Sequence, residues 1–406
     1  MITSYHVTTS ENKLIYYLFL LLIIVLYAFS TYKLLSVTMQ ALFVAVIFLE
    51  ILRVHKFRLT IHFLWMSLFI VWGLFISFFS YDISTSLSDV VNISFKLALL
   101  TSIIVFIDTE GKFHFALKSI LLSGIVLAIV ILLTVPLSDL GTDRLGKIVD
   151  VNSNRLGIVL SYASISAIYL SITLRKYKYL FPLPLFITLI LLTGSRKSLF
   201  AVGIAIILIM LLYSKDIKKL FSRLIIASGI LYGMYFLIMT IPTLYKIIGR
   251  RVESIGIFNG TLDASMVTRT TMLQEGFDLF LEKPIVGYGL ENYRLLSIYE
   301  TYSHSNYIEL LTSVGIIGTL IYYSLLIYLL TSSLIGRLKG DLRFNIIIIF
   351  LITILLMDAT LVSYKHLITQ VIIAISTSYF IYLKKTKVNN DKVKNQRGHV
   401  HVPENY

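Results

Sequence analysis

Long, continuous apolar stretches recur along the whole chain, and they constrain its fold more than any other feature of the sequence. A helix needs roughly 20 apolar residues to cross the hydrocarbon core of a bilayer. The stretches do not alternate apolar with polar residues, which excludes a membrane β-barrel. With 57% hydrophobic and only 14% charged residues, the chain also differs from soluble globular enzymes, disordered proteins and coiled coils. The pattern therefore predicts an all-α polytopic membrane protein.

Twelve apolar segments are candidates for membrane helices. They cover residues 14–31, 34–52, 61–80, 88–107, 115–135, 154–173, 180–194, 198–214, 223–241, 305–333, 344–361 and 367–383. We expect the first to be a retained span and not a cleaved signal. A signal peptide begins with a positively charged region, whereas the flank of this segment carries only Lys13, near Glu11.

These segments divide the chain into four parts. Residues 1–241 hold transmembrane helices one to nine, and residues 242–304 form one large extracytoplasmic loop. Residues 305–383 hold helices ten to twelve, and residues 384–406 form a polar, basic tail. Within the loop, apolar residues of the stretch 268–281 recur at helical spacing, which predicts an amphipathic helix at the membrane interface.

Lysine and arginine residues predict the orientation, because cytoplasmic loops carry an excess of both. With the N-terminus inside and twelve alternating spans, 22 of the 36 Lys and Arg residues fall on the inner side. Both termini are therefore predicted to be cytoplasmic. The formal net charge of +14 then reflects inner loops and a tail that attracts anionic lipid, and we expect no nucleic-acid partner.

Cations and other polar residues nevertheless collect on the predicted outer face, and for Lys and Arg this runs against the tendency just described. The outer ends of the spans contribute Arg144, Lys147, Asn154, Arg155, Arg196 and Lys197, and the large loop contributes Lys246, Arg250, Arg251, Arg269, Lys283, Arg294 and His304. A function on that side would explain them. For Arg269, composition alone leaves an equal alternative, namely an interfacial cation beside lipid headgroups.

His304 stands at the predicted outer entrance to the tenth span. A histidine can act as a base near neutral pH, although an interfacial histidine beside a helix start is the simpler interpretation. Gly315 and Gly318 follow it and, as small residues, would allow close helix packing. The outer acidic residues are scattered and the chain has no cysteine, so we predict no metal and no disulfide.

Four motifs together resemble the O-antigen ligase/polymerase family, whose integral membrane proteins join lipid-linked glycans on the outer face of the membrane. His304-Ser305, nine further residues and then Gly315-Ile316-Ile317-Gly318 resemble its His-containing motif. Arg269 with the run 283–293 (KPIVGYGLENY), the stretch 192–196 (LTGSR) and the stretch 152–157 (NSNRLG) resemble its upstream motifs, in the family's order. The commoner residue after the histidine is Asn, and Ser is an accepted variant.

The resemblance implies a membrane fold of the GT-C-like type and an inverting glycosyltransferase without metal or other cofactor. Its donor would be an oligosaccharide on undecaprenyl diphosphate. Arg196 and Arg269 would bind the diphosphate, because a guanidinium pairs with phosphate oxygens and stays charged. His304 would be the base, or at least orient the acceptor hydroxyl. The secondary candidates for binding diphosphate or glycan are Arg155, Asn154, Lys197, Arg144, Arg250 and Glu309.

Three functions stay open on the sequence alone. A polymerase, which joins repeat units of O-antigen, capsule or exopolysaccharide in the bacterial cytoplasmic membrane, is preferred. A ligase, which moves finished glycan to another acceptor, has nearly the same chemistry. A flippase for the lipid-linked unit is disfavoured, since Lys96 is the main charge within the spans. A chain-length regulator and a flippase are candidate partners.

Overall fold

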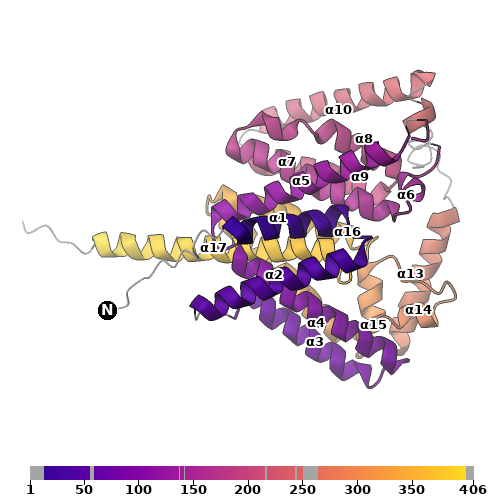
Figure 1. Ribbon diagram of the computed structural model, residues 1–406, viewed down its shortest axis with the longest axis vertical. Coiled ribbons are helices and arrows are strands. Elements are labelled where there is room, and N and C mark those ends of the chain that lie inside the picture. Colours follow the sequence, from indigo (N-terminus) through magenta and orange to yellow (C-terminus); the bar gives the residue numbers. More distant parts are fainter. Residues whose placement is uncertain are drawn as a thin grey trace, which may run out of the picture. The chain divides into compact units, whose positions relative to one another are not determined.

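The computed structural model describes residues 13–54, 59–136, 138–140, 142–214, 217–242, 245–249 and 264–398 (Figure 1). Within these ranges the chain is helical, and the one β-type pairing is an isolated bridge between Leu140 and Asp143. The protein is an all-α, polytopic membrane protein, as the sequence predicts.

Seven helices are long and apolar enough to cross a membrane. They are α2 (Lys33–Val54), α4 (Ile83–Phe106), α5 (Glu110–Thr134), α7 (Ser153–Leu174), α9 (Arg196–Tyr213), α15 (Asn306–Leu338) and the part Leu367–Lys387 of α17 (Leu367–Gly398). Four further apolar helical segments are shorter: α1 (Lys13–Ala28), α3 (Ile61–Ser77), Tyr177–Thr193 with α8 (Leu183–Thr193), and Leu342–Met357 with α16 (Asn345–Met357).

Each of the twelve predicted segments coincides with a helix, the ninth being α10 (Ile217–Thr240). Seven of them meet the length and hydropathy that a span requires. The count of twelve, the orientation and the four-part division of the chain stay predictions. The stretch 268–281 lies in helix α13 (Ala264–Glu282), which begins earlier than predicted, and its place at the membrane interface stays a prediction.

The helices form two compact units, each built from separate stretches of chain. Unit 1 comprises Met1–Arg58, Phe115–Leu199 and Ile241–Ile255, and within it α1 packs on α2 and α7 packs on α8. Unit 2 comprises Leu59–His114, Phe200–Thr240 and Gly256–Tyr406. In unit 2, α15 packs against α3, α13 and α16, while α17 packs against α4 and α16.

Local signals fix where several helices begin. The Asp82 side chain caps α4 by accepting a hydrogen bond from the Thr85 backbone N–H at 2.6 Å. The Asn152 side chain caps α7 by accepting from the N–H groups of Asn154 and Arg155 at 2.9 and 3.2 Å. Such a cap typically stabilises a helix by about 1 kcal/mol.

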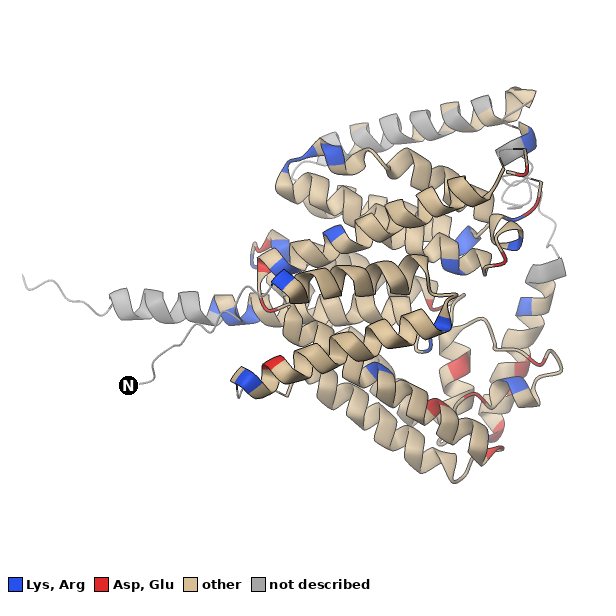
Figure 2. Cartoon of the chain, viewed as in Figure 1, with Lys and Arg blue, Asp and Glu red and all other residues tan. Residues whose placement is uncertain are grey.

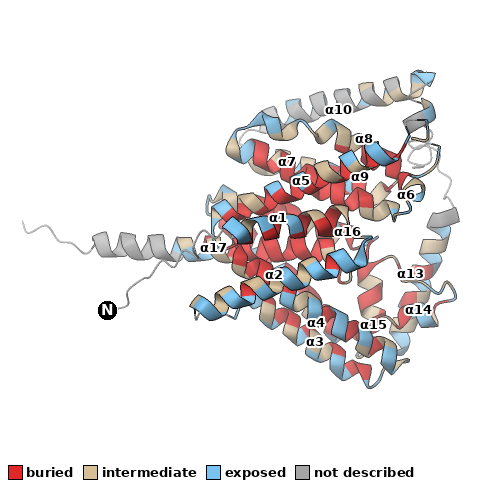
Figure 3. Cartoon of the chain, in the orientation of Figure 1, coloured by how far each residue is buried: buried red, intermediate tan, exposed pale blue. Residues whose placement is uncertain are grey.

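Burial differs sharply among the candidate spans (Figure 3). In α7 and α17, 83% and 78% of the apolar window is buried, against 17% in α2. The exposed residues of α2 include Leu34, Phe48 and Leu49, a surface that suits lipid better than water. Charged residues gather at helix ends and connections (Figure 2), as expected for helices that cross a bilayer.

Candidate functional site

A break in α15 organises the candidate site in unit 2. Gly315 has φ 65° and ψ −173°, values that no α-helix contains, so the helix is interrupted after Val314. The interruption leaves carbonyl oxygens of the preceding turn without their usual helical donors. The carbonyl oxygen of Thr312 accepts from Tyr288 N–H and that of Ser313 accepts from Gly289 N–H, both at 2.8 Å. The run 283–293 thus docks into the break.

Glycine is needed where these two segments touch. A Cβ at Gly287 (φ 70°) would lie 2.6 Å from the Thr312 carbonyl oxygen, and one at Gly315 would collide with the carbonyl oxygen of Ile285. The sequence predicted close packing at Gly315 and Gly318. Gly318 does pack closely, against Trp72, but the break at Gly315 was not predicted. The two glycine motifs therefore form one interlock.

His304 lies directly before α15 in a left-handed backbone conformation, with φ 60°. A non-glycine residue in that region is uncommon, though histidine is enriched there, and it persists only where neighbours hold it. Ser303 lies before it and Ser305 after it, and both are buried. The Ser303 hydroxyl donates to the Ser305 carbonyl oxygen at 2.9 Å, and the Ser303 N–H donates to Glu309 at 2.8 Å.

Arg269 and His304 both interact with Tyr302, His304 through a ring contact and Arg269 through its charge. The rings of Tyr302 and His304 have centroids 4.4 Å apart. Burial raises the pKa of the Tyr302 hydroxyl, and the positive charge of Arg269 opposes that rise. Helix α13, which carries Arg269, is tied to α15 by the Thr312 hydroxyl, which donates to the Gly276 carbonyl oxygen at 2.8 Å. Two of the predicted catalytic residues, Arg269 and His304, thus belong to one region of unit 2.

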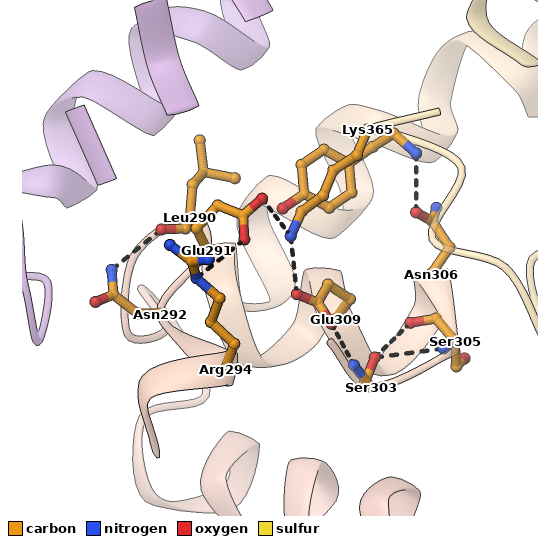
Figure 4. A network of polar contacts seen from close by, with 10 residues as sticks. Leu290, Glu291, Asn292, Arg294, Ser303, Ser305, Asn306, Glu309 and Lys365 are labelled. Carbon is orange, nitrogen blue, oxygen red and sulfur yellow. Dashed lines mark hydrogen bonds and ion pairs between the residues drawn. The ribbon is translucent and has the colours of Figure 1, made fainter. Parts of the chain in front are cut away.

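Lys365 lies between two carboxylates in the same unit (Figure 4). Its Nζ is 2.7 Å from Glu291 Oε1 and 3.3 Å from Glu309 Oε1, and we call these three residues the Lys365 clamp. The Glu309 side chain is 1% exposed. Burial disfavours the Lys365 ammonium, but the charges of Glu309 and Glu291 outweigh it and raise the pKa of Lys365. Glu309, a predicted secondary residue, thus binds Lys365 and the Ser303 N–H.

Asn306 fastens the first turn of α15 to the connection between α16 and α17. Its backbone N–H donates to the Asp358 carbonyl oxygen at 2.7 Å, and its side-chain NH₂ donates to Asp358 Oδ2 at 3.2 Å. Its Oδ1 accepts from the Tyr364 N–H at 3.1 Å. Sequence reasoning missed Asp358 and Lys365. Their one local signal is charge in a short connection between two apolar helices.

Unit 1 brings together the other two motifs of the predicted site. Asn154 Oδ1 accepts a hydrogen bond from the Ser195 hydroxyl at 3.1 Å, and the hydroxyl oxygens of Ser195 and Ser198 are 2.8 Å apart. A Cβ at Gly157 would lie 2.8 Å from Ser198 Cβ. The stretches 152–157 and 192–196, separate in sequence, are therefore packed against each other.

The predicted cations of unit 1 surround this contact. Arg155 donates through Nη2 to the Leu26 carbonyl oxygen at 3.4 Å, and its buried Nε has no hydrogen-bond partner among the described residues. The Arg144 side chain lies over Gly194, with its Nε 3.6 Å from the place a Cβ would take. Arg196 and Lys197 begin α9 just after Gly194.

The nine predicted site residues thus divide by unit. Arg269, His304 and Glu309 lie in unit 2, and Arg250 lies outside the described residues. The five others, Arg144, Asn154, Arg155, Arg196 and Lys197, lie in unit 1. In the described part of the chain, no group of three or more His, Cys, Asp or Glu residues is placed to hold a metal ion.

Comparison with known proteins identifies the region that holds most of this site. The sequence model of the family described as O-antigen ligase matches residues 181–323, which run from just before α8 to the second half of α15. The match includes Arg196, Arg269, the docked run 283–293, His304 and the break at Gly315. No curated protein matches the chain significantly. Residues 181–323 therefore carry the domain of the O-antigen ligase family.

Proposed function

We propose that this protein is a polymerase of a surface polysaccharide. It joins undecaprenyl-diphosphate-linked oligosaccharide repeat units of O-antigen, capsule or exopolysaccharide on the outer face of the bacterial cytoplasmic membrane. The O-antigen ligase domain indicates the reaction class, transfer of a lipid-linked glycan. The observation that carries the proposal to particular residues is the grouping of Arg269, Tyr302 and His304 beside the interlocked glycine motifs.

The reaction is a single displacement at the anomeric carbon of the donor. A hydroxyl oxygen of the acceptor glycan attacks that carbon, and the bond from the carbon to the diphosphate oxygen breaks on the opposite face. The configuration inverts, and undecaprenyl diphosphate leaves with the bonding electrons. Negative charge grows on the leaving diphosphate, so a cation beside it stabilises the transition state more than the ground state.

Arg269 and Arg196 fit the task of binding the diphosphate, because a guanidinium donates in pairs to phosphate oxygens and stays charged at neutral pH. Lys197, Arg144, Arg155 and Arg250 would add positive charge, and Asn154 would bind glycan or diphosphate.

His304 would accept the proton that the attacking hydroxyl loses. General-base catalysis typically contributes about 10²–10⁴-fold in rate. Its left-handed backbone supports this role, since strained residues held by their surroundings cluster at functional sites. Glu309 would help to orient His304 through the Ser303 N–H.

The proposal includes a topology. Twelve spans place both termini in the cytoplasm and expose the loop 242–304, with the active site, on the outer side. The reaction needs no metal ion, and a flippase and a chain-length regulator would act beside the polymerase. Chelator should leave the activity of the purified protein unchanged. Loss of activity in chelator, restored by a divalent ion, would disprove this part.

His304→Ala tests the catalytic assignment. In vesicles that hold purified protein and a lipid-linked oligosaccharide, we expect chain growth to fall by about 10²–10⁴-fold while the protein inserts normally. His401→Ala, in the tail, is the matched control. A flippase would keep moving the lipid-linked unit after His304→Ala. Wild-type chain growth in that variant would refute the assignment.

A ligase is the second candidate, because the matched family is described as O-antigen ligase. Deleting the gene separates the two functions. Loss of a polymerase leaves single repeat units on the carrier or the cell. Loss of a ligase leaves long chains on the lipid carrier, and that outcome would replace the polymerase assignment.

A further inference from the structure

Three segments that are distant in sequence meet at the Lys365 ammonium (Figure 4). Glu291 follows the docked Gly-x-Gly turn, Glu309 lies in the first turn of α15, and Lys365 lies just before α17. The backbone carbonyl oxygen of Lys365 accepts a hydrogen bond from Lys96 Nζ in α4 at 3.0 Å. The clamp therefore joins both glycine motifs to the last connection of unit 2.

Hydrogen bonds connect the Lys365 clamp to the residues on either side of His304. One oxygen of Glu309 pairs with Lys365, and the other accepts from the Ser303 N–H at 2.8 Å. The Ser303 hydroxyl then donates to the Ser305 carbonyl oxygen, so the residues on both sides of His304 are held. The clamp also holds Glu291, which has a left-handed backbone with φ 63°.

We propose that Lys365 is a positioning residue: its ammonium fixes Glu309, and Glu309 fixes the 303–305 turn that orients the imidazole of His304. The proposal rests on the proposed role of His304 as the base. Lys365 itself touches no reacting atom. It neutralises two carboxylates that would otherwise repel each other, and so keeps the Glu309 side chain correctly turned.

The competing interpretation is an ion pair that only stabilises the fold. Buried ion pairs often contribute little net stability compared with apolar replacements of similar volume. The two interpretations differ in what they do to catalysis. A positioning residue lowers kcat and leaves KM for the donor unchanged, whereas a purely stabilising pair changes the amount and thermal stability of the protein.

The experiment compares Lys365→Met with Lys112→Met in vesicles. Lys112 is a matched control, because its side chain is 9% exposed and pairs with Asp108 at 2.7 Å, also in unit 2. We expect Lys365→Met to lower kcat by about 10- to 100-fold, the cost of a small misplacement in an active site. Lys112→Met should keep the wild-type kcat. Lys365→Arg should retain most of the activity, since it restores the charge.

A double variant tests the route through Glu309. In Lys365→Met/Glu309→Gln the repelling charge is gone, while the amide oxygen can still accept from the Ser303 N–H. Its kcat should therefore rise above that of Lys365→Met alone. If Lys365→Met does not accumulate in the membrane, Glu309→Gln is measured in its place. We expect it to lower kcat less than Lys365→Met would and to leave KM unchanged.

The proposal is overturned if kcat of Lys365→Met equals that of Lys112→Met, or if its whole effect lies in KM or in protein amount. An unchanged kcat in Glu309→Gln would have the same meaning. His304→Ala, measured in parallel, separates the two claims. If His304→Ala keeps its activity, the proposed function fails. If His304→Ala is inactive and Lys365→Met is not impaired, only the positioning role fails.

Discussion

The two units stabilise their motif residues with different chemistry. In unit 1 the contact between the motifs uses neutral groups, the Asn154 amide and the hydroxyls of Ser195 and Ser198, and the predicted site residues around it are cations. In unit 2 the contacts around His304 run through carboxylates, those of Glu309 and Asp358. A cation-rich surface suits an anion such as diphosphate, and carboxylates suit the orientation of an imidazole.

This difference predicts which unit responds to pH. Arginine side chains stay charged at any pH that a protein tolerates. The raised pKa of Lys365 means that its stabilising contribution is complete below the usual 10.5 and is lost only as pH rises through the higher value of the folded protein. Neither the arginines nor the clamp lysine loses its charge near neutral pH, so a pH dependence of chain growth there would come from groups other than these.

The largest effect is expected from Gly315→Ala, which would break the interlock in unit 2. The new Cβ would meet the carbonyl oxygen of Ile285, in a backbone conformation that alanine rarely adopts. Overpacking and strain together should cost about 3 kcal/mol or more and abolish chain growth. Thermal unfolding in detergent and glycan length in cells measure the two effects.

Gly203→Ala in α9 is the control for this variant, because a Cβ there meets nothing within 4 Å. It should be neutral or stabilise the helix by up to about 1 kcal/mol. If Gly315→Ala is as stable and active as Gly203→Ala, the docking of the run 283–293 into α15 does not define the site.

An intermediate effect on chain growth is expected from replacing Arg196 in unit 1, and from exchanging arginine and lysine in the two units. Arg196→Ala should lower kcat by about 10²–10³-fold, the typical cost of removing one transition-state donor. Arg196→Lys should recover only part of it, because an ammonium is a point charge without paired donors. In unit 2 the reverse exchange, Lys365→Arg, should be tolerated. Arg175→Lys serves as the control, because Arg175 is exposed and lies at the end of α7. Full activity of Arg196→Lys would mean that unit 1 does not bind phosphate in this way.

The sequence predicted the helices well because their signal is local. A run of apolar residues specifies a membrane helix without reference to the rest of the chain, and all twelve predicted segments are helical. The motifs also predicted that Arg269 and His304 serve one site. Both residues interact with Tyr302 in unit 2, and their shared role stays a prediction.

The break and the clamp could not be predicted because their partners are distant in sequence. Small residues are typical of close helix packing, and only the docked run around Ile285 shows why Gly315 leaves the helix. Glu291, Glu309 and Lys365 lie in three different segments, and neither spacing nor composition pairs them. Only the folded chain brings these three residues together.

The smallest effect is expected from Asn154→Ala in unit 1. It removes one neutral hydrogen bond, to the Ser195 hydroxyl, which is worth about 0.5–1.5 kcal/mol. Chain growth should fall only slightly, because the arginines remain. Asn306→Ala in unit 2 should cost more, since it leaves the buried Asp358 and Tyr323 without their amide partner. Ser195→Ala should not add fully to Asn154→Ala, because the two share one bond. Melting temperatures of the three single variants and the double variant decide the matter: equal losses for Asn154→Ala and Asn306→Ala would contradict the contrast between neutral and charged contacts.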